Sequence, residues 1–101
     1  MLVNGNEFGV YATGAAASHA ALGNRTHVVT SISGSVSADA TISVLGGASG
    51  TTAIFVAVID ISVEGTSFSF TGLSILGDAG VKVEATSSAG TYHLTMCGHT
   101  I

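Results

Sequence analysis

The four histidines and the single cysteine are the side chains of this sequence best suited to holding a metal ion. His93 and His99 lie six residues apart, which is about 20 Å along an extended strand at ~3.3 Å per residue. No Cys-x-x-Cys or His-x-x-x-His spacing joins them to each other, to His19 or to His27. The sequence therefore predicts no metal site within one chain and no cofactor. It leaves open a meeting of histidines from different subunits.

A nucleophile beside a base is the other chemistry that these residue types suggest. Cys97 and His99 are two residues apart and would share one face of a strand. Nucleophilic catalysis also needs a third, orienting group and donors for an oxyanion, and the sequence marks neither. Asp60 and Glu64 are four residues apart but lack the surroundings of a glycosidase carboxylate pair. We therefore interpret Cys97 as a buried structural cysteine and expect a protein that is not an enzyme.

The small number of basic residues and the short apolar runs exclude two classes of partner. Lys and Arg number only two, too few to form the basic patch that nucleic acid requires. The longest apolar run covers residues 53–59, which is far shorter than the roughly 20 residues of a membrane-spanning helix. The N-terminus lacks the basic region and apolar stretch of a signal peptide. We expect no nucleic acid, no membrane, and synthesis and assembly within a cytoplasm.

Ser, Thr and Gly take the place of the missing charge. Charged residues make up 8% of the chain, where about 25% is usual. Soluble monomers normally keep apart through mixed surface charge. Either this chain tolerates weak colloidal stability, or much of its surface is covered by partners, and we favour the second interpretation.

The elements that must position these residues show a strand-like period of two. Six short runs alternate apolar with polar residues and end at Gly, Asp or Ser, which is typical of half-buried strands. Their spacing, about 12 residues, predicts an all-β, jelly-roll-like sandwich of about six to eight antiparallel strands. The runs cover residues 28–32, 40–44, 53–63, 67–70, 81–85 and 92–97. Glu64 and Gly65 are predicted to form a tight hairpin after the third run.

The first quarter of the chain differs from the rest. Residues 14–23 are mostly alanine between two glycines, a marginal length for a helix, so a short helical turn and an extended arm both remain open. We predict an N-terminal arm over residues 1–24 and a β-sandwich domain over residues 25–101.

The run over residues 53–63 is apolar on both of its faces. An ordinary strand of an antiparallel sandwich has one wet face, so both faces of this one should be covered. Either the N-terminal segment caps its outer face, or that face is a subunit interface around a symmetry axis. The two predicted faces carry Ile54, Val56 and Val58 on one side, and Phe55, Ala57, Ile59 and Ile61 on the other.

Two stretches give the sequence a family resemblance. The block Arg-Thr-His-Val-Val-Thr-Ser-Ile-Ser-Gly-Ser at residues 25–35 and the closing Tyr-His-Leu-Thr-Met-Cys-Gly-His at residues 92–99 resemble small β-rich structural proteins of tailed bacteriophages. The resemblance covers residues 23–101. It implies a capsid decoration, or cement, protein on the outer surface of the virion. Such proteins are commonly trimers that bind the major capsid protein where its subunits meet, using an N-terminal arm.

The resemblance fits a tail- or fibre-associated β-module that binds a host receptor or glycan nearly as well. For the decoration role, self-association is assigned to Ile54, Val56 and Val58. Contact with the capsid is assigned to Phe8, Tyr11, Ala15, Ala16, Ala17, His19 and Leu22.

Overall fold

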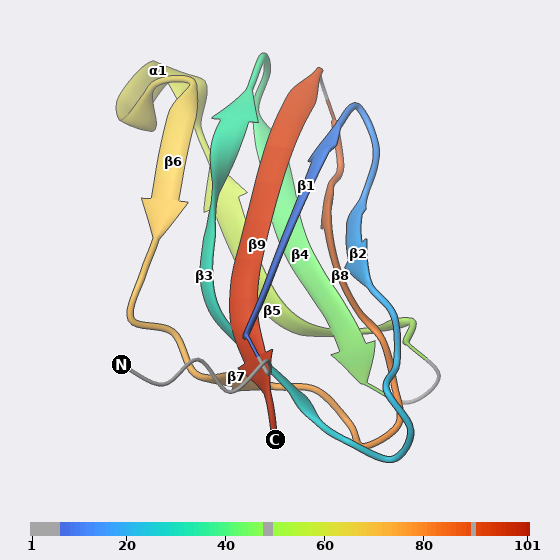
Figure 1. Cartoon of the computed structure of the whole chain (residues 1–101). Helices are drawn as coiled ribbons and strands as arrows, with labels where there is room; N and C mark the ends of the chain where they lie inside the picture. Colours follow the sequence, from blue (N-terminus) through green and yellow to red (C-terminus); the bar gives the residue numbers. More distant parts are fainter. Residues whose placement is uncertain (1–6, 48–49, 90) are drawn as a thin grey trace.

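Two antiparallel sheets pack face to face in the computed structural model, which describes residues 7–47, 50–89 and 91–101 (Figure 1). Sheet A has the order β1-β9-β3-β6, with β7 also paired to β3, and sheet B has the order β2-β8-β4-β5. The strands of sheet A are β1 (Glu7–Thr13), β9 (Tyr92–Thr100), β3 (His27–Val36), β6 (Ser67–Phe70) and β7 (Ile75–Leu76). The strands of sheet B are β2 (Ala17–His19), β8 (Val83–Ser87), β4 (Ala40–Gly47) and β5 (Thr52–Ile59).

The strand order is that of a jelly roll. Leaving out the two-residue β7, the chain alternates between the two sheets from β1 to β4 and then continues from β4 to β5 within sheet B. It returns to sheet A with β6, enters sheet B again with β8, and ends in sheet A with β9. Each sheet thus combines strands from the beginning and the end of the chain, as two Greek keys require. The predicted all-β, jelly-roll-like sandwich is confirmed.

The core lies between the sheets and takes every second residue of β4, β8 and β9, while β3 departs from this alternation. Burying one such aliphatic side chain contributes about 1.5–3 kcal/mol relative to leaving it exposed. No buried side-chain nitrogen or oxygen in the described part of the chain lacks a hydrogen-bond partner, so the core carries no polar penalty there. The largest fully buried apolar side chains are Ile32, Ile42, Ile59, Leu94 and Met96.

The strand predicted over residues 53–63 ends earlier than expected. β5 stops at Ile59, and a single helical turn, α1 (Ile61–Glu64), follows in place of the predicted Glu64-Gly65 hairpin. Asp60 begins this turn because its side chain accepts a hydrogen bond from the Ser62 amide at 3.0 Å. The hairpin prediction was wrong because it overlooked this N-cap and read the apolar Ile61 and Val63 as strand.

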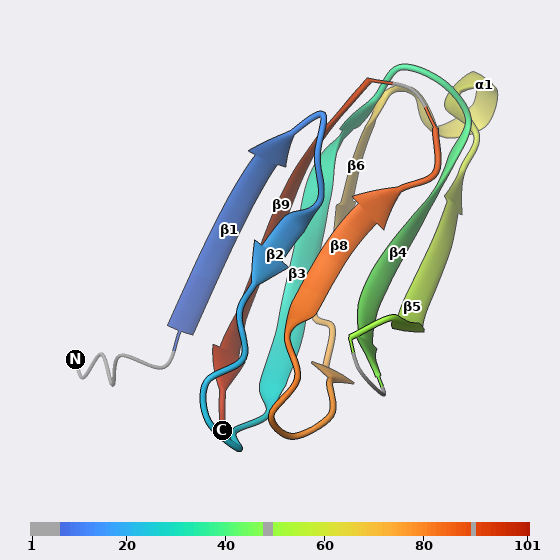
Figure 2. The same cartoon turned by 90° about the vertical axis from the view of Figure 1, so that its right-hand side faces the viewer.

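The N-terminal residues belong to the sandwich. β1 pairs with β9 over its whole length, from Glu7 opposite His99 to Thr13 opposite His93. β2 pairs with β8 in the other sheet, so the segment crosses between the layers, as Figure 2 shows. The division into an arm over residues 1–24 and a domain over residues 25–101 is therefore corrected. Residues 7–13 and 17–19 are edge strands of the same domain, and residues 1–6 lie outside the described part of the chain.

No helix in the described residues is long and apolar enough to cross a membrane.

Candidate functional site

The residues assigned to capsid contact divide between the interior and the surface. Phe8 and His19 come from facing strands β1 and β2, and their rings stack with centroids 4.2 Å apart. Ala17 is buried in the core. Phe8 and His19 are half-buried, so these three side chains pack within the sandwich, and Ala17 offers no surface to a partner. The exposed members of the set are Tyr11, Ala15 and Leu22, whereas Ala16 is half-buried.

A third ring completes the cluster at this end of the sandwich. The His27 ring lies 4.4 Å from that of His19 and 5.6 Å from that of Phe8, and His27 is fully buried. His27 Nε2 donates to the Ala20 carbonyl at 2.8 Å, since a carbonyl can only accept. Its other nitrogen, Nδ1, forms a hydrogen bond with the Thr100 hydroxyl at 2.7 Å. His27 therefore ties β3 both to β9 and to the connection after β2.

Burial lowers the pKa of His19 below its ordinary value of 6.5, and the charge that His27 would carry lowers it further. His19 therefore binds a proton less readily in the folded chain than an imidazole in water does. Two imidazoles in contact could begin a metal site, but no group of three His, Cys, Asp or Glu side chains that could hold an ion occurs among the residues described here.

Tyr11 belongs to a polar cluster on the outer face of sheet A. Its side chain is 66% exposed, and its hydroxyl lies 3.3 Å from His93 Nδ1. The Thr13 hydroxyl donates to the Tyr11 hydroxyl at 2.9 Å and lies 3.0 Å from the same His93 nitrogen. The cluster thus joins β1 to β9 and leaves most of the Tyr11 side chain exposed.

Apart from Glu7 at the start of β1, the strand residues on this outer face carry no Asp, Glu, Lys or Arg side chain, and many of them bear hydroxyl groups. Cross-strand neighbours place Thr95 between Tyr11 and Ser33, and Ser33 opposite Ser69. Cys97 lies on the same face, half-buried and opposite Gly9, so its interpretation as a core cysteine is corrected. At one end, a shallow depression of about 270 Å³ is lined by Ser35, Val36, Ser37, Thr66, Thr91 and His93.

The residues assigned to self-association lie on β5, at the edge of sheet B. Val56 and Val58 are 57% and 69% exposed, so the sandwich does not cover them. Ile54 is half-buried and does not join them, because the register with β4 shifts at this end of β5. A Cβ atom built on Gly46 would lie 2.9 Å from Ile54 Cδ1, which shows that Ile54 fills the space above that glycine. The N-terminal segment is not the cap of β5, since β2 lies at the opposite edge of sheet B.

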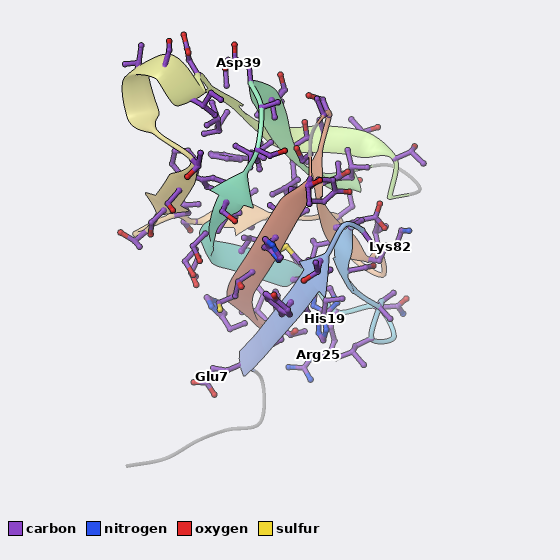
Figure 3. The ribbon with its side chains drawn as sticks, turned by 90° about the horizontal axis from the view of Figure 1, so that it is seen from above. Glu7, His19, Arg25, Asp39 and Lys82 are labelled. Carbon is purple, nitrogen blue, oxygen red and sulfur yellow. The ribbon has the colours of Figure 1, made fainter. Side chains whose placement is uncertain are left out.

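Charged side chains are few and are spread over the molecule. In Figure 3, Asp39 lies on the opposite side of the molecule from Glu7 and Arg25. Lys82 pairs with Glu84 at 3.1 Å, an exposed contact that contributes little to stability. Arg25 donates to the Thr100 carbonyl at 3.2 Å. None of these positions forms a patch of one sign that would attract a charged ligand.

Sequence reasoning missed the cluster of Phe8, His19 and His27. The three residues come from three different strands, and the sequence holds no spacing that would bring them together. The sequence did hold one signal for the burial of His27. Because His27 is two residues before Val29, the period of two places both side chains on one face of the strand, and the structure buries both.

Comparison of the chain with protein-family models finds no match, and comparison with curated proteins also finds none. The surface described above is therefore the basis on which a function is proposed.

Proposed function

We propose that this protein is a structural subunit that works by docking on its neighbours in a larger assembly, as a capsid decoration protein of a tailed bacteriophage. The observation that carries the proposal is the exposure of Val56 and Val58 on an uncharged edge strand, in a chain of which only 8% of the residues are charged. A long, flat, apolar edge is a site of association. The jelly roll itself is used in viral capsid proteins and in lectins, which supports the class by analogy only.

The proposed mechanism is mechanical. A subunit that spans the joint between two major capsid proteins adds contact area to both, and a specific interface of this kind buries about 1,200–2,000 Å² in total. Neutral hydroxyl-bearing faces suit this role because they can be buried without removing many charges from water. The exposed Tyr11 and Leu22 supply the larger apolar contacts on the β1 and β2 side.

Point substitutions test the shell contact better than a deletion of the N-terminal residues. Removing residues 1–22 would take β1 and β2 out of the two sheets and expose the core. The variants Tyr11→Ala and Leu22→Ala change exposed side chains only, and Val63→Ala, on α1 and 79% exposed, is the matched control. We expect co-sedimentation with shells lacking the protein to weaken for the first two variants and to stay unchanged for the control. No binding by the unaltered protein would contradict the proposal.

The second candidate is a tail- or fibre-associated module that binds a host receptor or glycan. The depression beside His93 favours it, because its lining of hydroxyl groups offers neutral hydrogen-bond partners next to the exposed Tyr11 ring. Gold labelling of virions separates the two candidates. Label over the capsid supports decoration, and label confined to the tail supports the receptor-binding module.

A further inference from the structure

We infer that β5 pairs antiparallel with β5 of a second copy of this chain, which joins two copies of sheet B into one continuous eight-stranded sheet. The inference rests on the proposed assembly function, and it names the surface and the symmetry through which copies of the chain meet.

The four edges of the two sheets differ in how they are protected. Natural proteins protect sheet edges with short strands and with charged residues. β2 has three residues and β6 has four, while β1 begins with the charged Glu7. β5 has eight residues, from Thr52 to Ile59, and none of them is charged or is proline. Of the described edge strands, β5 is thus the longest and the least protected against pairing.

The charges at the two ends of β5 select the antiparallel orientation. Asp39 and Asp60 lie beyond its C-terminal end, where they accept hydrogen bonds from the amides of Ile61 and Ser62 at 3.0 Å. A parallel pair would bring these carboxylates against the same carboxylates of the second copy. An antiparallel pair brings them beside the N-terminal end of the partner strand, and it is also the arrangement that a closed two-fold interface requires.

The stem of Lys82 lies at that N-terminal end. A Cβ atom built on Gly50, in the turn before β5, would lie 3.1 Å from Lys82 Cγ and 3.3 Å from Lys82 Cε. The ammonium group of Lys82 is paired with Glu84, so this end of the strand carries no net charge that would repel the partner's carboxylates.

The regular part of the strand fixes the register. Register shifts between β4 and β5 are confined to the end near Leu45 and Gly47, and residues 55–59 of β5 pair without interruption. Ala57 is the middle residue of that stretch. A two-fold axis at Ala57 places Val56 of each copy opposite Val58 of the other, which gathers four exposed valines on one face of the joined sheet.

Sedimentation velocity over a range of protein concentrations tests the pairing. We expect the unaltered protein to reach the mass of two chains. Val58→Lys adds a charge at the pairing site and is expected to remain a single chain, and Val56→Lys is a second variant of the same kind. Val63→Lys introduces the same residue on α1, at a position that is also well exposed, and should leave the two-chain mass unchanged. Circular dichroism checks that each variant keeps its strands.

Amide hydrogen exchange supplies an independent readout. Exchange of residues 55–59 should be slower in the unaltered protein than in Val58→Lys at the same concentration. A single-chain mass at every concentration would overturn the inference, and so would the three-chain mass that the phage resemblance implies. Shell binding by a chain that never pairs would overturn β5 pairing and leave the proposed function standing. Pairing without shell binding would overturn the proposed function and leave β5 pairing standing.

Discussion

His27 shows how one buried polar residue can tie an end of the sandwich together. Its two ring nitrogens reach Thr100 on β9 and the Ala20 carbonyl after β2, and the ring also contacts His19 and Phe8. A buried imidazole is stabilising only while both nitrogens keep partners. Residues far apart in the sequence therefore depend on each other at this point.

Replacing Thr100 with valine tests this dependence. The substitution keeps the shape of the side chain and removes the hydroxyl that His27 Nδ1 contacts, so the buried nitrogen loses its partner. We expect the free energy of unfolding to fall by about 1–3 kcal/mol in denaturant titrations. Thr95→Val, on the outer face of the same strand, is the control and should stay within about 0.5 kcal/mol of the unaltered protein. Equal effects of the two substitutions would show that the buried hydrogen bond is not what matters.

The lowered pKa of His19 predicts a stability that depends on pH. In the folded chain His19 binds a proton less readily than in the unfolded chain, whose pKa is near 6.5. The stabilisation is therefore complete above about pH 6.5 and declines as the pH falls below it. His19→Phe keeps a ring against Phe8 and removes the titrating group, so its melting temperature should change less between pH 8 and pH 5. The same slope in both proteins would contradict this origin of the pH dependence.

At the scale of the elements, β3 and β9 approach each other closely at a glycine. A Cβ atom on Gly34 would overlap the carbonyl oxygen of His93, which is in the neighbouring strand. Gly34 pairs with Leu94, whose side chain is fully buried, so the two backbones cannot separate without opening the core.

Gly34→Ala is therefore expected to destabilise the protein by about 1–3 kcal/mol, the usual range for overpacking. The matched change is Gly9→Ala on β1, where a Cβ atom would lie at an ordinary 3.6 Å from Cys97 Sγ. Thermal unfolding compares the two variants. A loss as large in Gly9→Ala as in Gly34→Ala would mean that glycine content, and not the close approach, sets the stability.

The elements also show how far a period of two can be followed. The period of two locates five of the strands with five or more residues to within a few residues, because one face of each is buried; these are β3, β4, β5, β8 and β9. It fails where the register shifts: Val29 and Ile32 are three residues apart, yet both are fully buried, because β3 is irregular between Val29 and Ser31. The same failure separates Ile54 from Val56 and Val58. A β-bulge leaves no mark on the hydrophobic pattern that would reveal it in advance.

At the scale of the whole molecule, the N-terminal residues were the hardest to place. Their composition suggested an arm, but Phe8 and Ala17 find their partners on strands more than 60 residues later in the chain. Such pairing depends on the closing of the sandwich and not on local sequence. The exposed valines of β5 could be predicted, because the run over residues 53–59 is apolar on both faces and a sandwich buries only one face of such a strand.

The central claim is that neighbouring subunits cover the weakly charged surface of this protein. Hydroxyl-radical footprinting of the chain, in its assembled particle and in isolation, tests this claim most directly. We predict that Val56 and Val58 are labelled in the isolated chain at low concentration and protected in the particle, and that Tyr11 is protected in the particle as well. Equal labelling of all three side chains in both states would contradict it.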